Sequence, residues 1–260
     1  MAEVASIPFE RSRRLRFDWL ASVLFRPRRT FAEIAAEPRG VWLTPLLVLS
    51  ATGLIHAIVA GVFKQAAAQS GGMSLPPGFE YYTPEQQAQF QQAMAATSGP
   101  VFVYVFPAIL SILGVWVGWL IVSGLLHLVF TLLGGRSSTS LASNLVAWGG
   151  LPLALRDGVR IVAMLVSRQL ITHPGLSGFV PADDGGLSIY LTQLLGLIDL
   201  YVIWHLVLLV IGARAGTGLA PLKAWAGPLI TLLVVLLLQA FFGFLSVQLG
   251  NLNTIRPFLF

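Results

Sequence analysis

Five long runs of apolar residues, separated by short polar or basic segments, dominate the pattern of the chain. A helix needs roughly 20 apolar residues to cross about 30 Å of hydrocarbon, and an open segment in lipid must be helical to satisfy its own backbone. The pattern therefore predicts an all-α, polytopic integral membrane protein, built as a bundle of five transmembrane helices. The spans are expected at about residues 41–63, 101–133, 141–166, 187–212 and 222–249.

The third run is the least regular of the five. Gly149, Gly150 and Pro152 interrupt it, and its second half contains Arg156 and Arg160. A proline inside a helix removes a hydrogen bond and clashes with the preceding turn. Two arrangements are therefore open: a continuous span, or a helix that breaks at Pro152 and brings the two arginines toward the membrane interface.

The residues before the first span predict a cytoplasmic, basic arm with two short amphipathic helices at the membrane interface. The second helix is expected to begin at Thr30, which has capping-box spacing to Glu33, and to end before Pro38. The apolar residues expected on these helices are Phe17, Leu20, Ala21, Leu24, Phe31, Ile34 and Ala35. The chain thus divides into the arm, a transmembrane domain and a short outer tail, at residues 1–40, 41–249 and 250–260.

Composition excludes the common soluble classes. Of the 260 residues, 56% are hydrophobic and 10% are charged, whereas an average soluble domain carries about a quarter charged residues. The mean hydropathy of +0.79 excludes a disordered chain. The lack of cysteine excludes disulfide frameworks and thiolate metal sites. Although the net charge is +5, eight of the 16 basic residues lie in the first 39 positions, so we expect a membrane flank and no nucleic-acid partner.

The basic residues also predict the orientation, because basic segments are retained on the cytoplasmic side. With the N-terminus inside, the cytoplasmic side holds eleven of them: Arg11, Arg13, Arg14, Arg16, Arg26, Arg28, Arg29, Arg39, Arg136, Arg214 and Lys223. The other side holds three: Lys64, Arg168 and Arg256. We therefore expect a cytoplasmic N-terminus and an outer C-terminus. Arginine outnumbers lysine fourteen to two, as in GC-rich bacterial genomes, so we place the protein in a bacterial inner membrane.

Four charged residues inside the apolar runs need partners, because a charge in hydrocarbon is costly. Arg156, Asp157 and Arg160 belong to the third run, and Asp199 lies at a similar depth in the fourth. The pattern predicts an ion pair in the bundle interior between Asp199 and Arg156 or Arg160. Two roles stay open: the pair fixes the position of the helices, or the cluster forms a polar cavity for a substrate headgroup or a proton.

Small residues at helical spacing allow helices to approach closely. Gly114 and Gly118 form a GxxxG pattern on the second span, and Gly53 and Gly61 belong to a stripe of small residues on the first. We interpret these glycines as sites of intramolecular packing in preference to dimerisation.

Catalytic motifs are missing from the sequence. It contains no GxSxG, HExxH or P-loop pattern, and its four histidines are scattered without ligand spacing. We therefore expect a protein that is no enzyme and that uses no cofactor and no metal.

Three segments of the chain resemble parts of a known family. Residues 26–34 read Arg-Pro-Arg-Arg-Thr-Phe-Ala-Glu-Ile before the first span, residues 140–152 run from a polar start to a Gly-Leu-Pro break, and residues 204–224 end in a short basic loop. Over about residues 25–245 the chain resembles the bacterial Yip domain family, the integral membrane relatives of Rab-interacting proteins. The resemblance implies a five-span fold with a cytoplasmic N-terminus and little chemistry.

Eukaryotic members of that family bind prenylated small GTPases through a cytoplasmic N-terminal domain. The matching segment of this chain has only about 40 residues and is rich in arginine, so we do not expect this chain to bind small GTPases. At least one bacterial relative works beside an ABC exporter.

The prediction is a non-catalytic membrane protein that binds membrane lipids and another membrane protein or organises the membrane, for example as a transporter accessory. The expected docking residues are Arg26, Arg28, Arg29 and Phe31. The alternative is a small-molecule or lipid transporter, or a permease subunit, that uses the intramembrane Arg156, Asp157, Arg160 and Asp199.

Overall fold

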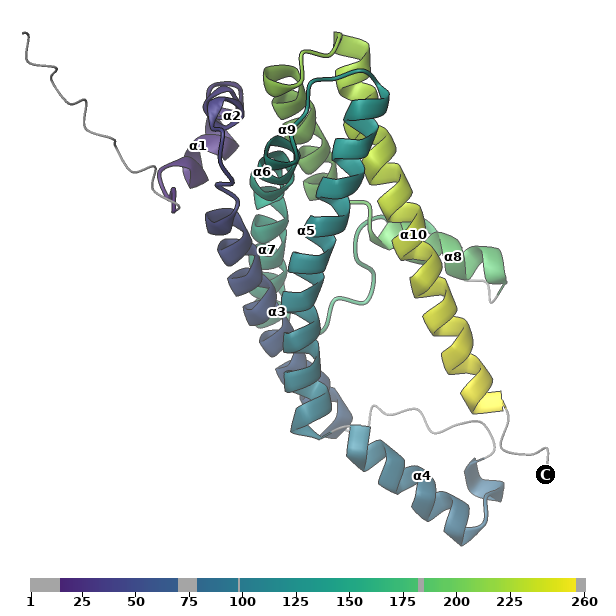
Figure 1. Cartoon of the computed structure of the whole chain (residues 1–260). Coiled ribbons are helices and arrows are strands. Elements are labelled where there is room, and N and C mark those ends of the chain that lie inside the picture. Colours follow the sequence, from purple (N-terminus) through teal and green to yellow (C-terminus); the bar gives the residue numbers. More distant parts are fainter. Residues whose placement is uncertain (1–14, 70–78, 98, 182–184, 256–260) are drawn as a thin grey trace, which may run out of the picture.

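The computed structural model describes residues 15–69, 79–97, 99–181 and 185–255, and these ranges contain helices and no strand (Figure 1). The parts of the predicted arm and tail at residues 1–14 and 256–260 lie outside the described residues. The helices are α1 (Trp19–Phe25), α2 (Pro27–Ala36), α3 (Leu43–Gln69), η1 (Phe79–Tyr81), α4 (Pro84–Thr97), η2 (Val101–Val105), α5 (Phe106–Leu132), α6 (Thr139–Gly149), α7 (Leu151–Ser167), η3 (Ser177–Phe179), α8 (Gly186–Gly196), α9 (Leu200–Gly216) and α10 (Pro221–Ile255).

Three stretches are long and apolar enough to cross a membrane as continuous helices: most of α3, η2 with α5, and most of α10. A fourth candidate is the pair α8 and α9, which meet at a bend of 60°. Within the described residues the protein is thus a multi-pass helical membrane protein with three to four membrane-length helices. The predicted number of five spans is not confirmed.

The third predicted span is divided into two helices. α6 ends at Gly149, α7 begins at Leu151, and Gly150 caps both helices. Pro152 lies in the first turn of α7, where its missing N–H removes no helical hydrogen bond. The Gly-Gly-Leu-Pro sequence therefore favours a break between two helices. The helices have 11 and 17 residues, and each is shorter than a full span.

α6 forms the centre of the packing. Every residue from Asn144 to Gly149 is buried, and α2, α5 and α9 all pack against this helix. The Trp148 ring, fully buried, meets the Trp19 ring of α1 edge to face at 5.5 Å between centroids. Aromatic side chains bury large areas and add specific geometry, so this pair fixes α1 on the bundle.

The apolar face of the second helix of the predicted arm is part of the protein core, whereas Phe17 and Ala21 of the first helix's predicted apolar face are exposed. Phe31 and Ile34 of α2 are fully buried in the cluster that contains the α6 and α9 side chains, so their apolar face meets protein and not lipid. α2 also begins at Pro27 and not at Thr30, whose hydroxyl donates a hydrogen bond back to the Arg26 carbonyl. The helix begins at Pro27 because the fixed φ of proline and its missing N–H suit the first helical position.

Basic segments gather at one end of the bundle. In Figure 1, α1, α2, the end of α9 and the start of α10 lie at the same end. The loop after α5 joins them, because Arg136 N donates to Thr217 O at 2.9 Å and Lys223 Nζ donates to Leu133 O at 2.9 Å. We call this region the basic end; its exposed basic residues are Arg26, Arg28, Arg29, Arg39, Arg136, Arg214 and Lys223.

Candidate functional site

Exposed aromatic and arginine side chains of the basic end lie at the junction of α1 and α2. α1 ends at Phe25, and the next residue, Arg26, donates its backbone N–H to Ser22 O. α2 begins directly afterwards, at Pro27, without a side-chain cap. This sharp junction brings exposed Phe25, Arg26, Arg28 and Arg29 onto one short stretch of surface. Phe25 is 82% exposed, and other aromatic side chains of the fold, such as Tyr81 and Phe179, are exposed to a similar extent.

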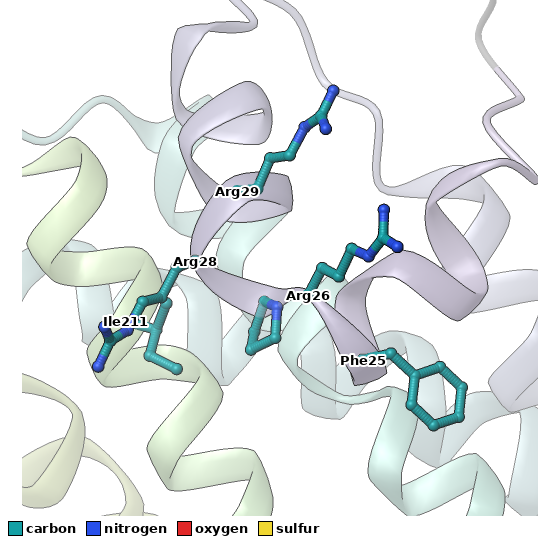
Figure 2. A pocket seen from close by; sticks show the side chains of 6 residues that line it. Phe25, Arg26, Arg28, Arg29 and Ile211 are labelled. Atoms are coloured by element: carbon teal, nitrogen blue, oxygen red, sulfur yellow. The ribbon is translucent and has the colours of Figure 1, made fainter.

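An open hollow of about 420 Å³ lies at this junction, lined by Phe25, Arg26, Pro27, Arg28, Arg29 and Ile211. Figure 2 shows Arg28 beside Ile211 of α9, whereas Arg26 and Arg29 extend to the other side of the α2 start. We call it the arginine hollow. Its lining combines three guanidinium groups with apolar surface and contains no carboxylate.

The three arginines differ in their partners. Arg29 Nε lies 3.2 Å from Glu33 Oε1, and Glu33 also accepts a hydrogen bond from Trp19 Nε1 at 3.1 Å. Among the described residues, no carboxylate forms an ion pair with Arg26 or Arg28. Arg26 nevertheless lines a neighbouring polar hollow together with Asp18 and Glu33, so Arg28 is the one arginine of the three that has no carboxylate beside it in either hollow.

Phe31, the fourth predicted docking residue, has a different position. It is fully buried, and a Cβ added to Gly212 of α9 would lie 3.0 Å from Phe31 Cδ1 and 2.5 Å from Leu145 Cδ2. Phe31 thus occupies the space that Gly212 leaves open. Its expected role in docking is corrected: it holds α2 on α9, and Phe25 is the exposed aromatic residue of this region.

Buried hydrogen bonds fix the arm beside the hollow. Asn144 Oδ1 accepts from Val41 N at 2.8 Å, and Asn144 Nδ2 donates to Arg39 O at 2.9 Å. Trp148 Nε1 donates to Val41 O at 3.0 Å. Sequence reasoning missed Asn144, although an amide inside an apolar run was a usable signal because a buried amide requires partners.

The intramembrane cluster is assembled by the two broken spans. Asp199 Oδ2 lies 3.7 Å from Arg156 Nη1 and 3.4 Å from Arg160 Nη2, so the predicted ion pair is present with both arginines. Arg156 Nε also lies 3.6 Å from Asp157 Oδ1. Asp199 in addition caps α9, because its Oδ1 accepts from Tyr201 N and Val202 N at 3.0 Å.

The helix breaks and the cluster are linked through α9. His205, one turn and a half beyond Asp199, places Nδ1 2.6 Å from Gly149 O, a carbonyl at the end of α6. The carbonyls at a helix end lack helical partners, so a side chain must satisfy this one where it is buried. Asp199 therefore lies at the break between α8 and α9, whereas its partners Arg156 and Arg160 lie within α7.

The predicted packing glycines behave in two ways. A Cβ on Gly53 would lie 2.7 Å from Ser111 Oγ, and one on Gly61 would lie 2.8 Å from Val103 O, so both allow the close approach of α3 to the η2–α5 segment. A Cβ on Gly114 or Gly118 would meet no described atom within 4 Å. The interpretation of Gly114 and Gly118 as intramolecular packing sites is therefore wrong.

Comparison with known proteins gives one match. The family model described as the Yip1 domain matches residues 21–243, from α1 into α10, and so includes both the arginine hollow and the intramembrane cluster. No curated protein and no solved structure matches the chain.

Proposed function

Because this chain belongs to the Yip1 domain family, we propose that it acts without catalysis, by binding a partner membrane protein through its basic end. In this proposal the basic end faces the cytoplasm and the partner is a membrane assembly such as a transporter. The excess of basic residues at that end supports the orientation.

The observation that carries this proposal is an exposed basic surface that buried contacts hold in place. Asn144 and Trp148 fix the segment before α3, and Phe31 fixes α2 on α9. The same arm leaves Phe25, Arg26 and Arg28 exposed. Arginine and aromatic residues dominate binding energy at interfaces, and a surface that is already ordered loses little entropy on binding.

Crosslinking in native membranes, followed by purification and mass spectrometry, tests the proposal. We expect a stoichiometric partner with the intact protein and its loss in a variant with Phe25→Ser, Arg26→Gln and Arg28→Gln. Arg136→Gln is the matched control, because it removes one exposed charge from the basic end outside the hollow. The same partners in every sample, or no enriched partner in any, would contradict the proposal.

A second candidate function, transport across the membrane, is supported by the intramembrane cluster. Discontinuous helices whose broken ends face charged groups are a feature of many transporters. Here Asp199 begins α9 at such a break and faces two arginines. This candidate would make Asp199, and not the basic end, the essential element.

A further inference from the structure

Polar side chains from two helices reach the same point on α3, at Gly53, where α3 packs against α5 and α7. A Cβ added to Gly53 would lie 2.7 Å from Ser111 Oγ of α5 and 4.0 Å from Asp157 Oδ2 of α7. Because glycine has no side chain, the hydroxyl and the carboxylate can both approach the α3 backbone here.

His56 belongs to the same face of α3. It follows Gly53 by three residues, and residues at this spacing are neighbours on a helix surface. Helical side chains lean toward the N-terminus, over the preceding turn, so the His56 ring covers the turn that contains Gly53. The charges that act on this ring are those of Asp157, Arg160 and Arg156, all from α7.

These polar groups lack hydrogen-bond partners within the part of the chain that the structure describes. Neither His56 nor Ser111 forms a side-chain hydrogen bond there, and Asp157 has only a charge contact, 3.6 Å from its Oδ1 to Arg156 Nε. Arg156 Nε is itself buried without a hydrogen bond. Polar groups inside an apolar bundle are costly unless they are paired. Asp157 Oδ2 is therefore an acceptor without a donor, beside a titratable ring.

The other titratable groups on the helices around His56 have different positions. η2 contributes Tyr104, whose hydroxyl donates to Gln65 at 2.7 Å, nine residues beyond His56. His127 of α5 lies near the basic end of that helix, and α6 contains no titratable residue. The carboxylate of Asp199 faces the two arginines of α7. Asp157 is thus the acidic group beside His56.

We propose that His56 and Asp157 form a proton-binding site inside the bundle. The His56 imidazole takes up a proton from water, and the imidazolium donates a hydrogen bond to Asp157 Oδ2. His56 lies near the middle of the candidate span Leu43–Ala67, and ionisable residues within spans mark proton pathways. The site goes beyond the proposed partner binding, because it depends on no residue of the basic end. For the transport candidate it identifies the proton as the ion that is moved.

Nuclear magnetic resonance of the full chain in detergent, with carbon-13 in the histidine rings, tests the site between about pH 5 and pH 8. The signal that disappears in His56→Gln belongs to His56, and we expect it to shift with pH as the ring is protonated. Asp157→Asn should weaken proton binding to His56 about tenfold, because it removes the negative charge beside the ring. Asp18→Asn, which removes an exposed carboxylate of the arm, is the matched control and should have no effect.

A His56 signal that does not change with pH would overturn the proposal, and so would equal effects of Asp157→Asn and Asp18→Asn. Thermal unfolding of the purified variants checks that they fold. If His56→Gln does not fold, a variant with His127→Gln and His173→Gln leaves two histidine signals, and a failure of both to respond to Asp157→Asn would overturn the site.

The sample contains no partner protein, so this test and the crosslinking test fail independently. A titrating His56 without any crosslinked partner would contradict only the proposed function. A crosslinked partner without a titrating His56 would contradict only this inference.

Discussion

Asp199 combines two roles in one carboxylate, and they can be separated by substitution. Oδ1 caps α9, whereas Oδ2 faces Arg156 and Arg160. Asn is as good an N-cap as Asp, so Asp199→Asn removes the charge and keeps the cap. We expect it to lower the free energy of unfolding by about 2 kcal/mol, less than for a fully buried pair, because the arginines lose their shared counterion.

Unfolding of the purified protein in detergent, followed by circular dichroism, measures this loss. Asp199→Ala should cost about 1 kcal/mol more, because it also removes the cap. Asp18→Asn is the control for loss of an exposed carboxylate, which pairs with Arg16 at the surface. An Asp199→Asn protein of unchanged stability that has lost proton flux into liposomes would contradict the structural role and favour the transport candidate.

At the residue scale, the contacts of a side chain can be predicted from the sequence when few residues are suitable partners for it. Asp199 was matched to its arginines because charges inside apolar runs are rare. Phe31 was assigned correctly to an apolar helix face, but spacing does not reveal whether lipid or protein covers that face. Tertiary packing decided it: Gly212 on a distant helix leaves the space that Phe31 fills.

Contact of α3 with the η2–α5 segment depends on its glycines. An added Cβ on Gly61 would meet the Val103 carbonyl, a backbone atom that cannot rotate away. We expect Gly61→Ala to destabilise the protein by about 2 kcal/mol through overpacking. Gly114→Ala and Gly118→Ala should be neutral, or stabilising by up to about 1 kcal/mol, because alanine favours helix and nothing obstructs it.

The same detergent unfolding assay compares these variants, and Gly114→Ala is the matched control for Gly61→Ala. Equal destabilisation at both positions would contradict the packing.

Oligomer size is the second measurement. If Gly114→Leu reduces it, the open GxxxG face contacts another copy of the chain; if not, that face meets lipid.

At the element scale, the sequence signals for the breaks were present but admitted two arrangements. Gly149, Gly150 and Pro152 predicted either a continuous third span or a break at Pro152, and the structure has the break at Gly150. The bend before α9 was missed, because residues 187–212 form one mostly apolar run in which Asp199 is the only Asp, Glu, Lys or Arg. That single residue was interpreted only as an ion-pair partner, although it also has the chemistry of a helix cap.

For the whole molecule, the helical membrane class and the family were predictable from composition and motifs, whereas the number of crossings was not. Length and hydropathy identify a span only when one helix supplies it. α6 and α7 share one path, and in Figure 1 α7 continues the course of α6 alongside α3. Together these helices have the length of one crossing at 1.5 Å per residue, and the fifth predicted crossing stays a prediction.

The position of the end of α10 tests this arrangement, because an odd number of crossings places it opposite the basic end. The chain has no cysteine, so single cysteines can be introduced without other substitutions, at Tyr81 and Leu249, which are exposed, and at Ser137, which is half-buried in the loop after α5. We expect a membrane-impermeant maleimide to label Tyr81→Cys and Leu249→Cys in intact cells, and Ser137→Cys only after permeabilisation. Labelling of Leu249→Cys together with Ser137→Cys would mean four crossings, with α6 and α7 inserted from one side without reaching the other.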